Sequence, residues 1–302
     1  MNMKKRKTKH IIIFFSLLIV FSLSYVLLYK TTIKLNHPYP ANRITKFVKP
    51  NSCKDSVYIG VISRFTPEKI YKGYQPIMDY LTEQTGLCFG LKLGSTYSET
   101  IEMLKEGKVE AAFAGTFIFI KENKGDLFAV LKPLNSNLMP FFRSVLITKN
   151  SSSIDSISDL RNKKIALPSP EAFSSFWFKN IFLKKHQMSL NDLKKITYFG
   201  YHNSVVRQVL MGNYDAGVVK GRVANEYKDK GIKIVAYSFP FPGSPIIISE
   251  KSNPRIVKLI VTSLLNSTTQ IRKSWDKEFL FGFVKASNKD YDILKNIIKE
   301  NK

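Results

Sequence analysis

The sequence predicts an α/β protein of two lobes, preceded by one transmembrane helix. Nineteen uncharged residues, 11–29, follow a basic cluster at the N-terminus. From residue 56 onward, short runs rich in β-branched residues alternate with amphipathic segments, a pattern typical of strands packed against helices. Prolines interrupt this alternation near residue 140 and again near residue 240, where we expect the chain to cross between the lobes.

The N-terminal segment has the features of a signal-anchor. Residues 1–10 are basic and residues 11–29, at 1.5 Å per residue, nearly match a hydrocarbon core of about 30 Å. Positive charge before the span places residues 1–10 in the cytoplasm and the remaining chain outside it. The alternative is a cleaved secretory signal, for which Ser22 and Ser24 offer a weak cleavage site. Residues 30–54, with three prolines, are expected to link membrane and domain.

Composition narrows the possible partners. With 302 residues, 44% of them hydrophobic, the chain can form two domains of ordinary size. The net charge of +24 comes from scattered lysines, and no nucleic-acid-binding module is recognisable, so we expect no nucleic-acid partner. Attraction to anionic lipid or cell-wall polymer remains open. Cys53 and Cys88 each begin a predicted strand, and an oxidising compartment would allow a disulfide between them.

Motifs of catalysis and metal binding are not found in the sequence. It contains no Gly-x-Ser-x-Gly turn, no His-Glu-x-x-His helix and no glycine-rich phosphate loop. Of its four histidines, only His202 falls in the predicted cleft. We therefore expect neither an enzyme nor a bound metal or cofactor.

The first lobe is predicted to comprise residues 55–140 together with 240–302. Thr66, Pro67 and Glu68 form a typical helix start, and Gly86 a typical helix end. Strands are predicted at residues 57–62, 88–93, 109–114, 127–131 and 246–248, and helices at residues 66–86, 98–107 and 256–264.

The second lobe is predicted to span residues 141–239. Ser169, Pro170 and Glu171 again have the pattern of a helix start. Both lobes are expected to contain parallel sheets, with the ligand in the cleft at the carboxyl ends of the strands. Strands are predicted at residues 144–148, 164–167, 196–199, 215–219 and 232–237, and helices at residues 169–186 and 202–210.

Four stretches, in matching order and spacing, resemble the substrate-binding proteins of phosphonate, phosphite and phosphate ABC transporters. The resemblance covers roughly residues 55 to 270 and implies a type II periplasmic-binding-protein fold. The stretches are residues 97–104 with 107–112, 143–147 with 157–164, 200–206 with 212–217, and 241–245.

This resemblance also implies a ligand set, consisting of Tyr97, Ser174, His202, Arg222 and Ser244. In the family, residues at a helix start hold the phosphonate oxygens, and the corresponding positions here are residues 172–174. Only Ser174 among them keeps a hydroxyl. Glu171, directly before them, would repel an anion. Arg222 and Ser244 stand where aminophosphonate binders carry acids, and Ala114 stands where they carry a second tyrosine. A purely structural role remains the alternative for each: packing for Tyr97 and His202, a helix start around Ser174, and a solvated helix face for Arg222.

Missing acids argue against an aminoalkyl ligand, and an arginine in the cleft favours an anionic group. We therefore expect an extracytoplasmic, membrane-anchored solute-binding protein for a phosphorus oxyanion or another small anion. Its partner would be an ABC permease. The alternative is a sensory or adaptor domain that signals through a membrane sensor protein.

Overall fold

The computed structural model describes residues 16, 18, 20, 22–24 and 56–301. Within these residues no helix is long and apolar enough to cross a membrane. Most of the predicted span at residues 11–29 lies outside the described part, as do residues 1–10 and the whole linker at residues 30–54.

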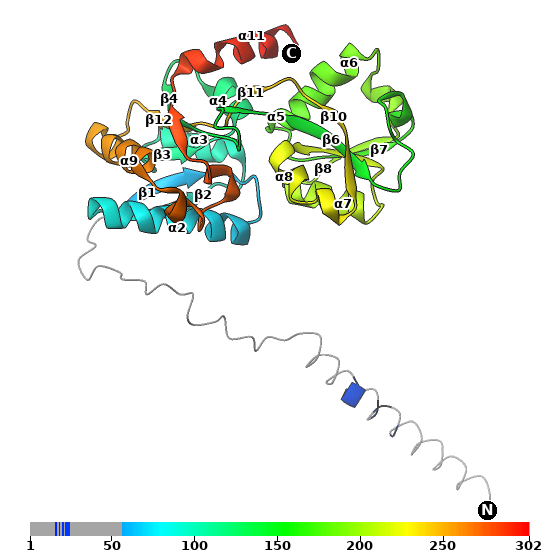
Figure 1. Ribbon diagram of the computed structural model, residues 1–302, viewed down its shortest axis with the longest axis horizontal. Helices are drawn as coiled ribbons and strands as arrows, with labels where there is room; N and C mark the ends of the chain where they lie inside the picture. Colours follow the sequence, from blue (N-terminus) through cyan, green and yellow to red (C-terminus); the bar gives the residue numbers. More distant parts are fainter. Residues whose placement is uncertain (1–15, 17, 19, 21, 25–55, 302) are drawn as a thin grey trace, which may run out of the picture. The chain divides into compact units, whose positions relative to one another are not determined.

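Two main sheets form the core of the folded domain, as predicted for a two-lobed α/β protein (Figure 1). The first sheet has the strand order β13-β4-β12-β3-β1-β2. Its strands are β1 (Ser56–Val61), β2 (Cys88–Leu93), β3 (Ala111–Phe113), β4 (Leu127–Pro133), β12 (Ile246–Ser249) and β13 (Phe283–Lys285). The helices of this lobe are α2 (Pro67–Thr85), α3 (Tyr97–Lys105), α4 (Thr116–Glu122), α9 (Pro254–Asn266), α10 (Thr269–Arg272) and α11 (Asp292–Glu300).

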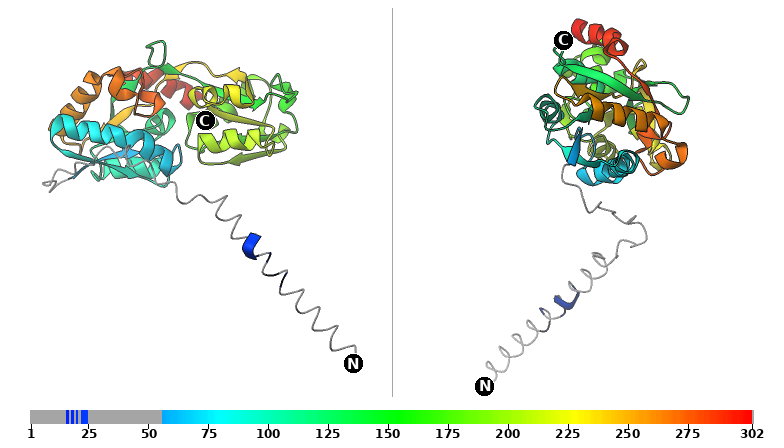
Figure 2. Two further views of the ribbon diagram at one scale, coloured as in Figure 1. Left: turned by 60° about the horizontal axis from the view of Figure 1, so that its bottom comes forward. Right: turned by 90° about the vertical axis from the view of Figure 1, so that its left-hand side faces the viewer.

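The second sheet has the strand order β10-β6-β9-β7-β8. Its strands are β6 (Ser144–Lys149), β7 (Lys164–Leu167), β8 (Lys195–Tyr198), β9 (Ala216–Lys220) and β10 (Ile232–Tyr237). Its helices are α5 (Phe173–Phe176), a π-helix (Trp177–Phe182), α6 (Leu183–Lys185), α7 (His202–Leu210) and α8 (Gly221–Asn225). Figure 2 shows this group of elements beside the first lobe from two further directions.

Both sheets are mixed, which corrects the prediction of parallel sheets. In each lobe the strand that arrives from the other lobe is antiparallel to both of its neighbours: β12 lies between β3 and β4, and β6 lies between β9 and β10. The two crossing segments themselves pair as a short antiparallel ribbon, β5 (Phe141–Phe142) with β11 (Phe241–Pro242). This ribbon is the structural hinge, because it is where the chain passes between the sheets.

The proline and glycine residues predicted both ends of helix α2 correctly, whereas the predicted start of the helix after β7 was wrong. Helix α2 begins at Pro67 and ends before Gly86, whose φ of 72° is left-handed, as predicted. The helix expected from Ser169 instead begins at Phe173. Residues 169–172 form a turn, in which the Ala172 N–H donates to the Ser169 carbonyl at 3.0 Å. The sequence Ser169-Pro170-Glu171 has the composition of a helix start, but its turn delays the helix and leaves Glu171 outside it.

The predicted disulfide involves one residue that the structure does not describe. Cys88 begins β2, and its register partner in parallel β1 is Ser56. Cys53 lies three residues before Ser56, outside the described residues. The bridge between Cys53 and Cys88 therefore stays a prediction.

Candidate ligand-binding site

A small cavity of about 40 Å³ lies between the lobes, at the ends of several strands. Its walls come from the segments that follow β1, β2, β3, β7 and β8, from the end of β9, and from the hinge strand β11 and the loop after it. Four of the five predicted ligand residues line it: Tyr97, Ser174, His202 and Ser244. Its other polar and charged lining residues are Arg64, Thr116, Glu171 and Lys220.

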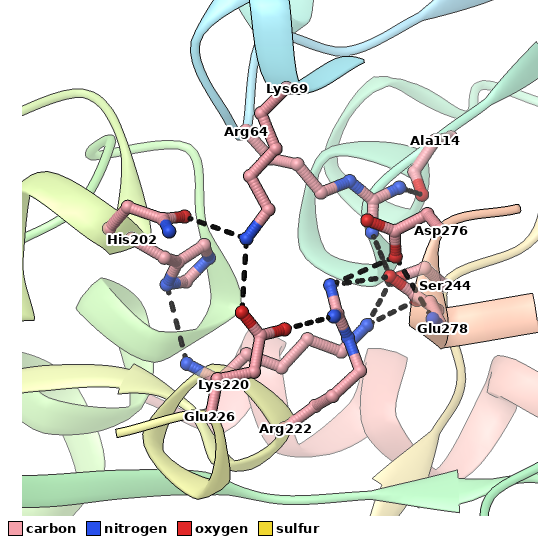
Figure 3. A network of polar contacts seen from close by, with 11 residues as sticks. Arg64, Lys69, Ala114, His202, Lys220, Arg222, Glu226, Ser244, Asp276 and Glu278 are labelled. Carbon is pink, nitrogen blue, oxygen red and sulfur yellow. Dashed lines mark hydrogen bonds and ion pairs between the residues drawn. The ribbon is translucent and has the colours of Figure 1, made fainter. Parts of the chain in front are cut away.

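Two cations from opposite lobes converge on Ser244 (Figure 3). Arg64 follows β1 and is 4% exposed, and its Nη1 donates to the Ser244 hydroxyl at 3.2 Å. Lys220 ends β9, and its Nζ donates to the same oxygen, also at 3.2 Å. The Arg64 Nη2 is fixed by the Ala114 carbonyl at 3.1 Å. Buried cations of this kind require a negative partner.

That partner is Glu278, whose side chain is fully buried. Its Oε2 accepts from Arg64 Nη1 at 3.0 Å, and its Oε1 accepts from Lys220 Nζ. Burial alone would raise the pKa of Glu278, but the neighbouring Lys220, Arg64 and Arg222 hold it below the ordinary value. Glu278 therefore stays ionised and joins the lobes through one carboxylate.

Burial also sets the protonation of Lys220. It lowers the pKa of Lys220 to about 8, assisted by the positive charges of Arg64 and Arg222 and opposed by Glu278. The amine is thus protonated at neutral pH, and it loses its charge in mildly alkaline solution. An anion beside Nζ would favour the protonated form.

His202 begins helix α7 and is 5% exposed. Its Nδ1 accepts a hydrogen bond from the Lys220 backbone N–H at 3.3 Å. Burial, with the charges of Lys220 and Arg64, lowers the pKa of His202 to about 3, so the ring is neutral. Because Nδ1 accepts, the ring proton is on Nε2, which makes His202 a neutral hydrogen-bond donor.

Tyr97 and Ser174 are both buried in the cavity wall. The Tyr97 hydroxyl has no hydrogen-bond partner among the described residues, so it is available to a ligand. The Ser174 hydroxyl already shares a 2.9 Å hydrogen bond with Ser144. Tyr97 is therefore the better placed of the two to receive a guest.

Arg222 does not line the small cavity. Its Nη1 pairs with Glu226 at 2.6 Å and its Nη2 with Asp276 at 3.1 Å. It lines a larger cavity of about 540 Å³, whose walls include hinge strand β5, helix α8 and residues 277, 278, 280 and 281. The two carboxylates already neutralise Arg222, so it is less suited to an additional anion than Lys220.

Sequence reasoning missed Arg64, Lys220 and Glu278. The first two carried a usable signal, because each is a charged residue at or just beyond the carboxyl end of an apolar strand, where ligands collect in such sheets. Glu278 carried none, since it lies in a short 3₁₀ segment (Lys277–Phe279) more than fifty residues from Lys220.

The chain matches a family of known proteins along most of its length. Residues 59–291 match the family model described as ABC transporter, phosphonate, periplasmic substrate-binding protein. The phosphate-import protein PhnD of Mycolicibacterium smegmatis is 20% identical over 276 residues, covering 80% of this chain and 85% of that protein.

Solved structures share the fold at low identity. PhnD1 of Prochlorococcus marinus in complex with methylphosphonate gives a TM-score of 0.72 at 14% identity, over 81% of this chain and 97% of that one. The binding component of a Pseudomonas aeruginosa ABC phosphonate transporter gives a TM-score of 0.69 at 14% identity, over 81% of this chain and 87% of that one. These relatives are transport proteins and not enzymes. The chain therefore belongs to the family of periplasmic substrate-binding proteins of phosphonate ABC transporters.

Proposed function

We propose that the chain is a membrane-anchored, extracytoplasmic receptor that closes on a small phosphorus oxyanion and delivers it to an ABC permease. The observation that carries the proposal is the cavity in which Arg64, Lys220 and the Nε2 donor of His202 meet. Phosphate, phosphite and methylphosphonate are the ligands it would suit. Relatives of the same family import phosphate or bind methylphosphonate.

Charge and hydrogen bonding support an anionic guest. Arg64 and Lys220 are cationic, while His202 and Tyr97 offer neutral donors, so oxygens on several sides of one small anion would find partners. Charge-assisted hydrogen bonds of this type are about twice as strong as neutral ones. Both lobes contribute donors, and a bound anion would therefore hold them together.

Size supports a compact guest. One water molecule requires roughly 10–15 Å³ of cavity volume. The cavity of about 40 Å³ therefore holds about three waters or one small tetrahedral anion. A long organic substituent would meet Phe173 and Phe241 in the wall. An aminoalkyl group would meet the positive charges of Arg64 and Lys220 in the cavity wall.

Calorimetric titration of the full-length chain, purified in mild detergent, tests the proposal. We expect heat of binding with phosphate, phosphite or methylphosphonate and much weaker heat with 2-aminoethylphosphonate. Lys220→Met should abolish binding, whereas Lys149→Met should leave it unchanged, because Lys149 is an exposed residue at the end of β6 in the same sheet. Absence of heat with every phosphorus oxyanion would refute the proposal.

Membrane anchoring and domain limits belong to the same proposal. Residues 11–29 are uncharged and follow a basic segment, which supports an uncleaved single-pass helix at the cell membrane. Residues 55–140 with 240–302 would form the first lobe and residues 141–239 the second. Extraction of the protein from washed membranes only by detergent, and an intact N-terminus by mass spectrometry, are the expected results.

A sensory role is the second candidate. It would use the same closure to signal through a partner protein in place of a permease. The ion pairs that already join the lobes, Lys220 with Glu278 and Lys69 with Glu226, are compatible with such a switch. Solute uptake that depends on this chain supports transport, while a transcriptional response without uptake would support sensing.

A further inference from the structure

Glu171 is a carboxylate in the wall of a cavity that is otherwise suited to anions. It comes from the turn before α5 in the second lobe and reaches helix α3 of the first lobe. Its Oε2 accepts from the Tyr97 backbone N–H at 2.9 Å, and its Oε1 accepts from the Ser98 hydroxyl. The negative charge is thus fixed at the helix N-terminus, where the helix dipole stabilises it.

The charges around the cavity balance before any ligand enters. Arg64 and Lys220 supply two positive charges, and Glu171 and Glu278 supply two negative charges. Both oxygens of Glu278 are bonded to the two cations, and this fully buried side chain does not line the small cavity, so it offers nothing to a ligand there. A ligand with two negative charges would therefore give the site a net charge of −2. A ligand with one negative charge would give it a net charge of only −1.

Glu171 differs from Glu278 because it lines the cavity, where the free lone pairs of its oxygens can meet a ligand. Each carboxylate oxygen can accept about two hydrogen bonds, and each Glu171 oxygen accepts one from helix α3. These two bonds also keep the carboxylate from turning away from the cavity while the lobes are closed. An acidic O–H on the ligand would convert a repulsive contact into a charge-assisted hydrogen bond.

We infer that Glu171 determines specificity by accepting a hydrogen bond from an acidic O–H of the ligand. This inference rests on the proposed function and narrows it: the site takes a singly protonated phosphorus oxyanion, such as hydrogen phosphite or hydrogen methylphosphonate. A tetrahedral dianion that carries no proton, such as sulfate, is rejected by Glu171.

Titration of the full-length chain in detergent with phosphite, methylphosphonate and sulfate, between about pH 5 and about pH 7, tests the inference. This range spans the second ionisation of a phosphoryl group near pH 6. Affinity for phosphite should fall as the pH rises and the ligand loses its proton. The other groups that face the cavity are constant here: Arg64 and Lys220 stay charged and His202 and Tyr97 stay neutral.

The variant Glu171→Gln removes the charge and keeps the shape. We expect wild-type protein to bind phosphite roughly 10- to 100-fold more tightly than sulfate, and Glu171→Gln to lose most of this preference. The affinity of Glu171→Gln for phosphite should also depend less on pH. The matched control is Glu99→Gln. Glu99 is an exposed carboxylate in the first turn of α3, the helix that Glu171 contacts, and it does not line the cavity. Glu99→Gln should keep the wild-type preference.

The outcomes separate the two claims. Wild-type protein that binds no phosphorus oxyanion contradicts the proposed function itself. Protein that binds phosphite with equal preference in Glu171→Gln and Glu99→Gln, or that binds sulfate as tightly as phosphite, overturns only the role of Glu171. If Glu171→Gln binds nothing, the wild-type profile decides, because affinity that rises with pH would mean that the dianion is preferred.

Discussion

Replacing Glu278 by glutamine removes the one negative charge shared by Arg64 and Lys220. Arg64 and Lys220 are 4% and 7% exposed, so neither can recover its hydration in place. Breaking a buried ion pair by removing one partner costs about 3–5 kcal/mol. For a domain of this size we expect the thermal midpoint to fall by roughly 6–20 °C.

Fluorescence of the buried Trp177 and Trp275, one in each lobe, reports the unfolding of full-length protein in detergent. The control is Glu250→Gln, since Glu250 is exposed. Glu278 has a lowered pKa, so its contribution is fully present above the ordinary glutamate pKa, about 4.3, and disappears as the pH falls through the folded value. Added phosphite should stabilise Glu278→Gln more than wild type, because the anion replaces the lost carboxylate. A midpoint change equal to that of Glu250→Gln would refute this reasoning.

Three further predictions concern the site and the fold. Anion affinity should fall as the pH rises above about 8, where Lys220 loses its proton, and Lys220→Arg should remove this alkaline loss in calorimetry, because arginine stays charged. His202→Ala should weaken binding about 10- to 100-fold through loss of its Nε2 donor, whereas the exposed His186→Ala should not; equal affinities would exclude His202 as a ligand residue. Gly217→Ala should lower stability by about 1–3 kcal/mol, because its Cβ would lie 2.6 Å from Val205 Cγ1; an unchanged thermal midpoint would contradict the packing of α7 on β9.

Strand periodicity predicted the two-lobed α/β fold because buried strands are short, apolar and separated by amphipathic helices. The direction of pairing could not be predicted from it. An inserted strand such as β12, with the sequence Ile-Ile-Ile-Ser, is apolar on both faces whether its neighbours are parallel or antiparallel. Insertion depends on where the chain returns after the hinge, which is a property of the whole fold.

The site was predictable only in part, for a physical reason. The family resemblance located Tyr97, Ser174, His202 and Ser244, and these line one cavity. It also suggested Arg222, which the structure places beside Glu226 and Asp276. Ion pairing between lobes depends on side chains that are remote in sequence, such as Lys220 and Glu278, and no local pattern encodes that proximity.

The role of Glu171 shows the same limit. Its place in the sequence Ser169-Pro170-Glu171 suggested the first turn of a helix, where it would repel an anion. Its contacts with Tyr97 and Ser98 come from the other lobe and give the carboxylate a different partner.

A crystal structure of the full-length chain grown with phosphite tests the central claim most directly. We expect one tetrahedral ligand in the small cavity, with oxygens about 3 Å from Lys220 Nζ and His202 Nε2 and the lobes closed around it. Phosphite found only in the larger cavity beside Arg222, or an empty small cavity at saturating phosphite, would contradict the account.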